Sequence, residues 1–200
     1  MISYQEALTI IQSEVKSFGE ELVPLDNSLD RILAEDIFTN RDYPPFNRSA
    51  MDGIAVNIKD LEAGIREFEI SEIIYAGQIN HTTLTKGQCY KIMTGAAVPP
   101  STNAVIRNED ILFSENNAKI NSNNYFLYQN IAQKGQDLKI GDKVLNSGKK
   151  INPSTIALLA SLGKHQILIE KLPSVAIFTT GNEVIPINHV VSDVQIHNSN

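Results

Sequence analysis

The 200-residue chain contains no tryptophan and a single cysteine, and only 20% of its residues are charged. Because Cys89 has no second cysteine to pair with, the chain forms no internal disulfide and has no cysteine cluster for zinc. The densest apolar run, residues 156–162, is too short to cross a bilayer and already contains Ser161. The N-terminal residues lack the basic start of a signal peptide. We therefore expect a soluble, cytoplasmic globular protein without a membrane partner.

Positive charge is also scarce, because 17 basic residues face 23 acidic ones and give a formal net charge of −6 at pH 7. A general nucleic-acid binder needs a concentrated positive surface to displace counterions from phosphates. We therefore expect no nucleic-acid partner. An anionic ligand would have to be held locally, by a metal ion, by single Arg or Lys side chains, or by backbone N–H groups.

The first segment has the pattern of a helix. Ser3 and Glu6 have capping-box spacing, and apolar residues recur at three- and four-residue steps from Leu8 to Phe18. Gly19 can supply the left-handed residue with which many helices end. The pattern therefore predicts a helix that ends at Gly19.

From about residue 40, short apolar runs alternate with Gly, Asn, Pro and Thr, which is typical of a β-rich domain. The asparagine-rich stretch 115–124 is predicted to be a hairpin tip, because Asn tolerates positive φ. Strands or extended chain are predicted at residues 22–25, 34–38, 53–56, 68–75, 88–93, 104–107, 111–113 and 125–128, and one helical turn at 29–33.

The last quarter of the chain has a different pattern. Asn152 and Pro153 are typical of the N-cap and first position of a helix, which Gly163 would end. A strand is predicted at 166–170 and a fully apolar strand at 175–178. A strand this apolar is normally covered on both faces of a parallel sheet, and too few residues follow it to build one. We therefore expect a second domain that has only begun, in a chain that is cut short.

Four loops of small residues could hold a ligand, and two of them lie in the predicted β-rich part. Asp52, before Gly53, could present a carboxylate at a fixed position, or it could only bond its own backbone in a hairpin turn. Thr94 follows a predicted strand, where its hydroxyl and the neighbouring N–H groups could bind an anion. The same pattern also suits an ordinary exit from a strand.

The other two loops lie further along the chain. Asp137 and Asp142 lie close to glycines, so either could face a ligand or simply shape a turn. Glu183 ends the loop 179–183, which follows the predicted apolar strand. Ligands of open α/β sheets bind at the carboxyl ends of strands, and Glu183 could hold magnesium through its carboxylate.

Five segments form an ordered set of motifs. They are PPFNRSAMDG (44–53), IMTGAAVPP (92–100), GQDLKIGD (135–142), LLASLG (158–163) and VAIFTTGNE (175–183). Together and in this order, they resemble the molybdopterin molybdotransferase family, which comprises the MoeA proteins and the gephyrin E domain. The closing QIHNSN (195–200) is similar to the start of a further segment of that family. The resemblance covers essentially the whole chain and implies the N-terminal half of a longer protein.

The resemblance implies an α+β fold in which one domain is discontinuous. Residues 1–40 and 139–170 would form this N-terminal dimerisation domain, with a β-rich lid domain of residues 41–138 inserted into it. Residues 171–200 would begin an α/β domain that binds molybdopterin.

The resemblance also implies a reaction, the magnesium-dependent insertion of molybdate into adenylylated molybdopterin with release of AMP. It implies a homodimer whose active site is shared between subunits, with molybdopterin adenylyltransferase as the upstream partner. By motif position, the implied catalytic residues are Asp52, Thr94, Asp137 and Glu183, and Glu183 is also the implied metal ligand. The implied substrate-binding residues are Ser49, Gly95, Thr180, Gly181 and Asn182. The 200 residues alone are expected to be inactive.

Three residues depart from the family pattern, and two other functions stay open. Asn47 replaces a frequent acidic residue, Ile54 replaces a usual aromatic one, and Asn182 stands where many relatives have aspartate. The last change could weaken metal binding. A non-catalytic dimeric scaffold of gephyrin type would need neither magnesium nor AMP release. A β-rich module with incidental turn acids would require the ordered motif matches to arise by chance.

Overall fold

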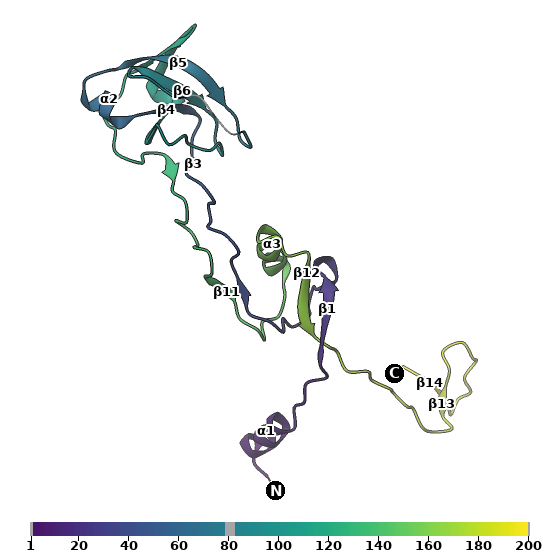
Figure 1. The fold of residues 1–200 in the computed structure, drawn as a ribbon. Coiled ribbons are helices and arrows are strands. Elements are labelled where there is room, and N and C mark those ends of the chain that lie inside the picture. Colours follow the sequence, from purple (N-terminus) through teal and green to yellow (C-terminus); the bar gives the residue numbers. More distant parts are fainter. Residues whose placement is uncertain (1, 79–82, 200) are drawn as a thin grey trace. The chain divides into compact units, whose positions relative to one another are not determined.

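The computed structural model describes residues 2–78 and 83–199, and Figure 1 shows its helices and strands. The fold class is α+β, as expected, with few helices and one large sheet. Contacts within the chain define two compact units. The first unit contains residues 1–35, 150–160 and 164–200, and the second contains residues 36–149 and 161–163. The expected domains, 1–40 plus 139–170, 41–138 and 171–200, stay a prediction.

The first unit is built on two antiparallel strands that are far apart in the sequence. β1 (Glu20–Pro24) pairs along its whole length with β12 (Gln166–Glu170). Alternate residues of β12 are buried, and Leu33 and Leu159 are also buried in this unit. Both strands lie where the apolar runs predict them, because the alternation of buried and exposed residues matches the period of a strand.

α3 (Pro153–Ser161) begins where the sequence predicts it. Asn152 Oδ1 accepts hydrogen bonds from the backbone N–H of Thr155, at 2.9 Å, and from its hydroxyl, at 3.0 Å. The cap therefore satisfies a donor of the first turn that has no partner within the helix. Gly163 follows the helix with a φ of +75°, as expected of a helix terminator.

α1 (Tyr4–Ser13) is shorter than the sequence predicts. Its capping box is present, because the Glu6 amide donates to Ser3 Oγ and the Ser3 amide donates to Glu6 Oε2. The helix ends before Phe18 and before the expected terminator Gly19. None of the residues of α1 is buried. Helices in proteins gain most of their stability by packing an apolar face. Because the apolar residues of α1 are not packed, they do not stabilise further helical turns toward Phe18.

The second unit is centred on a six-stranded sheet, drawn in blue and teal in Figure 1. Its order is β7-β4-β6-β5-β9-β8; β5 pairs with β6 in parallel, and the other neighbours are antiparallel. Ile54 and Val56 belong to one apolar cluster and Ala55 to another, because successive residues of a strand point to opposite faces. The strands are β4 (Gly53–Val56), β5 (Glu67–Ile74), β6 (Gln88–Ile92), β7 (Ala104–Arg107), β8 (Ile111–Ser114) and β9 (Asn117–Ile120).

Short strand pairs complete the second unit. β3 (Arg48–Ser49) pairs with β10 (Ile131–Ala132), and β2 (Ile37–Phe38) pairs with β11 (Lys143–Leu145). The first pair joins two segments that carry or adjoin candidate site residues. Since such short pairs are stable only within a larger structure, their position depends on the rest of the unit.

The remaining helical segments are short. α2 (Ile58–Glu62) is capped by Asn57, whose Oδ1 accepts a hydrogen bond from the Lys59 amide. This helix was not predicted from the sequence. Two 3₁₀ turns lie at Leu25–Asn27 and Asn108–Asp110. Within residues 2–78 and 83–199, every helix falls short of the length and apolar content needed to cross a membrane.

Two local expectations are wrong, and a third, the hairpin tip, is confirmed with fewer residues than expected. Residues 125–128 form no strand, because 125 and 126 are irregular and 127–130 form a turn in which Tyr128 has a φ of +62°. Residues 29–33 contain a turn with Asp30 at a φ of +63°, where a helical turn was expected. A left-handed residue interrupts both strand and helix, and the apolar pattern does not reveal it. The asparagine-rich hairpin tip is also shorter than expected, because β9 occupies residues 117–120.

The expected apolar strand at residues 175–178 is not formed. The segment has no regular structure, and the side chains of Val175, Ile177 and Phe178 are exposed. Among the described residues, no strand pairs with this segment. A strand conformation would therefore give its backbone N–H and C=O groups no hydrogen-bond partners. Further on, β13 (Val184–Ile185) and β14 (Ile196–His197) form a small parallel pair.

Candidate functional site

Asp52 and Thr94 meet at one end of the large sheet. Asp52 directly precedes β4, Thr94 follows β6, and the register of these strands places Gly53 opposite Ile92. The backbone amide of Thr94 donates to Asp52 Oδ1 at 2.6 Å, and the Thr94 hydroxyl donates to the same oxygen at 2.7 Å. Strand pairing therefore joins two of the predicted site residues.

Gly53 lets the chain after Asp52 run close to the neighbouring strand. A Cβ atom at position 53 would overlap the backbone carbonyl of Ile106 on β7. The backbone carbonyl of Asp52 also accepts a hydrogen bond from the Asn108 amide, at 3.0 Å. The backbone of Asp52 is therefore held by the strand that follows it and by the turn that contains Asn108. Only glycine fits at position 53, since any side chain there would overlap β7.

The Asp52 carboxyl is exposed and held in its charged form. The hydroxyl of Thr94, and then its backbone amide, lower the pKa of Asp52 below the usual value of an aspartate. Asp52 is therefore an anion at neutral pH. Such a group is suited to holding a cation or orienting a donor, and it is poorly suited to accepting a proton as a general base.

Ser49 and Gly95 belong to the same loop pair. The Gly95 amide donates to the carbonyl of Ser49, and the Ser49 amide donates to the carbonyl of Ala96, both at 2.9 Å. The buried hydroxyl of Ser49 donates to the carbonyl of Met51 at 2.6 Å. These bonds shape the loops around Asp52, and substrate binding by Ser49 and Gly95 stays a prediction.

Asp137 lies in a separate loop of the same unit. Its amide donates to the carbonyl of Tyr43 at 2.9 Å, and the amide of Gly135 donates to the carbonyl of Pro44, also at 2.9 Å. The side chain of Asp137 is exposed. The first motif segment thus touches the loop of Asp137 through its backbone.

Asp42 and Asn47 hold this loop, and neither was predicted as a site residue from the sequence. Asp42 Oδ1 accepts a hydrogen bond from the amide of Ile140 at 3.0 Å, and Asn47 Oδ1 accepts one from the amide of Lys134 at 2.9 Å. The Ile140 amide, helped by the Lys134 side chain, lowers the pKa of Asp42. Asn47 was considered only as a departure from the family pattern. Asp42 and Ile140 lie 98 positions apart in the sequence. A contact between residues so far apart cannot be predicted from local sequence patterns.

The loop of Glu183 belongs to the first unit. Gly181 has a φ of +124°, and a Cβ atom at that position would collide with the Glu183 carboxylate. The Thr179 hydroxyl oxygen accepts a hydrogen bond from the Asn198 side chain at 3.1 Å. Glu183 is exposed, as are the predicted substrate-binding residues Thr180, Gly181 and Asn182. The roles of these four residues stay predictions.

The described residues contain no group of three or more His, Cys, Asp or Glu side chains that could hold a metal ion. Mg²⁺ does not require such a cage, because it keeps several waters and is usually held by one or two carboxylates together with substrate phosphates. The exposed carboxylates of Asp52 and Glu183 have the oxygen chemistry that this mode of binding needs.

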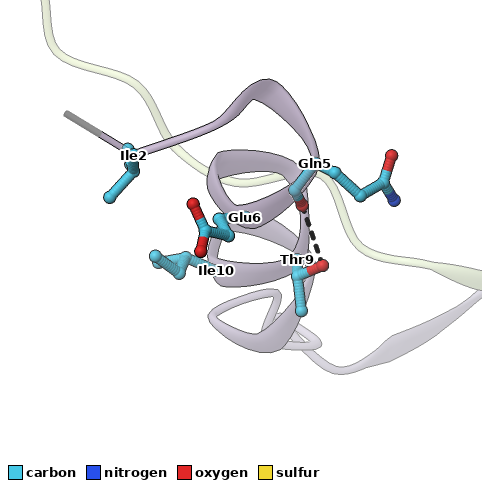
Figure 2. A pocket seen from close by; sticks show the side chains of 5 residues that line it. All are labelled: Ile2, Gln5, Glu6, Thr9 and Ile10. Carbon is cyan, nitrogen blue, oxygen red and sulfur yellow. Dashed lines mark hydrogen bonds between the residues drawn. The ribbon is translucent and has the colours of Figure 1, made fainter.

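Two cavities of the described residues have linings that contain none of the predicted catalytic residues. Figure 2 shows the one on α1, where the Thr9 hydroxyl donates to the carbonyl of Gln5 and Glu6 belongs to the capping box. Its lining residues are Ile2, Gln5, Glu6, Thr9 and Ile10. A second cavity adjoins the turn before Asp52 and is lined by Met51, Arg107, Asp110, Ser122, Asn124, Gln129 and Asn130. Several of its polar groups already have partners within the protein, as in the ion pair between Arg107 and Asp110.

Comparisons with known proteins agree with each other. The family model described as "MoeA N-terminal region (domain I and II)" matches residues 2–163. The molybdopterin molybdenumtransferases of Staphylococcus epidermidis (strain RP62A) and Staphylococcus aureus (strain Mu50) are each 36% identical over 203 residues. Those alignments cover 100% of this chain and 48% of either relative, so the chain spans about half the length of the curated relatives it matches.

Two crystal structures of molybdopterin biosynthesis MoeA proteins from Pyrococcus horikoshii are similar in fold. One has a TM-score of 0.82 and 31% identity, over 99% of this chain and 51% of that protein. The other has a TM-score of 0.84 and 34% identity, over 92% of this chain and 50% of that protein.

Proposed function

The chain belongs to the family of the MoeA N-terminal region, as its motifs led us to expect, and we propose that it serves molybdenum cofactor biosynthesis within a molybdopterin molybdenumtransferase. The observation that carries this proposal is the contact between Asp52 and Thr94, at 2.6 and 2.7 Å. This contact joins the motif segments 44–53 and 92–100. Both residues are exposed, so a substrate can reach them.

The proposed reaction is the magnesium-dependent insertion of molybdate into adenylylated molybdopterin, with release of AMP. Both substrates are anionic, and this chain carries a formal net charge of −6. Overall attraction therefore does not favour binding, and local groups have to supply it. When bound, Mg²⁺ would neutralise negative charge on the phosphoryl and molybdate oxygens.

The residues of this chain have separate roles in the proposal. Thr94 keeps Asp52 ionised and directs one carboxylate oxygen of Asp52 toward itself. Asp52 and Glu183 are assigned to holding the metal ion or positioning the substrate, with Glu183 as the proposed metal ligand. Asp137 has a supporting polar role. Ser49, Gly95, Thr180, Gly181 and Asn182 are assigned to substrate binding.

The assembly and setting are part of the same proposal. We assign the protein to the cytoplasm, as a homodimer whose active site is shared between the subunits, without nucleic-acid or membrane partners. Molybdopterin adenylyltransferase would supply the adenylylated substrate. The acidic composition agrees with the lack of a nucleic-acid partner.

AMP release tests the proposal directly. A protein of the relatives' full length that includes these residues is mixed with adenylylated molybdopterin and molybdate, with and without Mg²⁺. AMP should appear only with Mg²⁺, and Asp52→Ala and Glu183→Ala should each lose most of the activity while staying folded. Wild-type turnover in either variant would remove that residue from the proposed site.

The second candidate function is a non-catalytic dimeric scaffold of gephyrin type. The observation that favours it is the exposed apolar surface of α1, where Ile10 and Ile11 remain 53% and 65% exposed. Figure 2 shows Ile2 and Ile10 on the same side of the helix. A scaffold would release no AMP in the same assay, with or without Mg²⁺, and would keep its dimeric state in the Asp52→Ala variant.

A further inference from the structure

We propose that Asp42 and Asn47 are positioning residues, which hold the two ends of the loop 134–140 and thereby fix Asp137 in place. The inference rests on the proposed role of Asp137 and adds two residues that act through it. Asp42 lies just before the first motif and Asn47 lies within it, so one stretch of chain holds the loop at both ends.

Asp42 holds the end of the loop that follows Asp137. Its Oδ1 accepts the hydrogen bond from the Ile140 amide at 3.0 Å, and its Oδ2 lies 3.5 Å from Nζ of Lys134. Its side chain is only 24% exposed. The longer, solvent-exposed contact with the Lys134 ammonium contributes little, so the bond to the Ile140 amide is the contact that positions the loop.

Asn47 holds the end that precedes Asp137. Its Oδ1 accepts the hydrogen bond from the Lys134 amide at 2.9 Å, while its backbone carbonyl accepts one from the Val98 amide at 2.8 Å. Val98 lies in the same motif segment as Thr94. One residue therefore connects the loop of Asp137 with the segment that binds Asp52.

The middle of the loop is held by backbone groups of the same segment. The carbonyl of Tyr43 accepts hydrogen bonds from the amides of Asp137, at 2.9 Å, and Leu138, at 3.2 Å. The Tyr43 amide donates to the carbonyl of Leu138 at 2.8 Å. Gly135, with a φ of +70°, turns the chain against the side chain of Asp42.

This arrangement matters because the Asp137 carboxylate is exposed and has to be positioned from its backbone. Exposed loops are more mobile than the elements they connect. A side chain of a catalytic or binding site, by contrast, has to be held within roughly 0.5 Å of its productive position. Bonds at Lys134, at Asp137 itself and at Ile140 restrict the loop on both sides of the carboxylate.

The chain offers a matched control in Asp36. Its Oδ1 accepts a hydrogen bond from the Ser147 amide at 2.9 Å, and its Oδ2 lies 2.6 Å from Nζ of Lys143. This is the same pair of contacts that Asp42 makes, on a turn that carries none of the proposed site residues. A loss that is only structural should therefore affect Asp36 and Asp42 variants alike.

The test measures kcat and KM of AMP release in a protein of the relatives' full length. Asp42→Ala and Asn47→Ala should lower kcat by roughly tenfold to a hundredfold while KM changes little. Asp42→Asn and Asn47→Asp keep an acceptor oxygen, so both should retain kcat within about threefold of the wild type. Asp36→Ala should stay within about twofold. In an Asp137→Ala background, Asp42→Ala should cause no further loss, because it acts through the missing carboxylate.

The outcomes separate the inference from the function on which it rests. Wild-type kcat in Asp137→Ala would overturn the role of Asp137 and the inference together. Loss of activity in Asp137→Ala, with full activity in Asp42→Ala and Asn47→Ala, would overturn the inference alone. If both alanine variants fail to fold while Asp36→Ala folds, the contacts are structural and the inference is also overturned. Hydrogen exchange at the Ile140 amide should speed up in Asp42→Ala, and unchanged exchange there would contradict the proposed contact.

Discussion

Thr94 donates two hydrogen bonds to one oxygen of Asp52, from its backbone amide at 2.6 Å and from its hydroxyl at 2.7 Å. The second carboxylate oxygen takes no part in these bonds. The two residues lie 42 positions apart in different motifs, and the pairing of β4 with β6 brings them together. The pair therefore combines a fixed orientation with a lowered pKa, and this allows the tests that follow.

Removing the Thr94 hydroxyl should raise the pKa of Asp52. In Thr94→Val the backbone amide bond remains, while the hydroxyl bond, which contributes most to the shift, is lost. Because the pKa of Asp52 is lower in the folded protein, its stabilising effect is present above the unfolded-state pKa and is lost as the pH falls through the folded-state pKa. NMR titration of the Asp52 carboxyl carbon should show a higher midpoint in the variant, and AMP release should decline at a higher pH on the acid side. An unchanged midpoint would show that the hydroxyl does not hold the charge.

A side chain at position 53 should disrupt the pairing of β4 with β7. In Gly53→Ala the new Cβ overlaps the Ile106 carbonyl, so a strand has to shift, at a cost of about 3 kcal/mol in the free energy of unfolding. Gly148→Ala is the control, because its position has a φ of +80° but no atom within 4 Å of the added Cβ. It should cost only about 1 kcal/mol. Urea unfolding compares the two, and equal losses would contradict the close approach at Gly53.

The two helix caps should differ in their effect on global stability. Asn152→Ala removes the acceptor for two donors of Thr155 and should lower the free energy of unfolding by about 1 kcal/mol. Ser3→Ala removes the capping box of α1, but no residue of that helix is buried. It should therefore fray α1 without changing the urea midpoint, and increased hydrogen exchange in α1 would report the fraying. A global loss in Ser3→Ala would mean that α1 is packed in solution.

Cys89 should be inert in the folded protein. It lies on β6 with no exposed surface, and burial raises the pKa of its thiol to about 12. The reactive thiolate is therefore absent at neutral pH. Iodoacetamide should leave native Cys89 unmodified at pH 8 and label it after unfolding in urea, as followed by mass spectrometry. Rapid labelling of the native protein would show that β6 opens readily.

Several elements could be predicted from the sequence because their signals are local. The strands β4, β7 and β12 coincide with apolar runs, and the cap at Asn152 follows from residue types at fixed offsets. The capping box at Ser3 was also predicted, although the length of its helix was not. Helix length depends on what an apolar face packs against, and that information is not local.

The apolar segment 175–178 shows the opposite case. Its composition favours a buried strand, and the structure leaves it irregular because no described strand pairs with it. Tyr128 and Asp30 similarly take left-handed conformations that their neighbours in sequence do not reveal. In each case the residue types allow more than one conformation. The contacts with the rest of the protein, or the lack of such contacts, decide which conformation forms.

For the candidate site, the sequence by itself determined which family the chain belongs to and which residues we propose for the chemistry. Asp52, Thr94, Asp137 and Glu183 stand in recognisable motifs, and those motifs depend only on residue order. The tertiary structure alone decided that Thr94 binds Asp52, and that Asp42 and Asn47 hold the loop of Asp137. Residue order sets local preferences over a few positions. Contacts between distant residues depend on strand register, which emerges only when the sheet assembles.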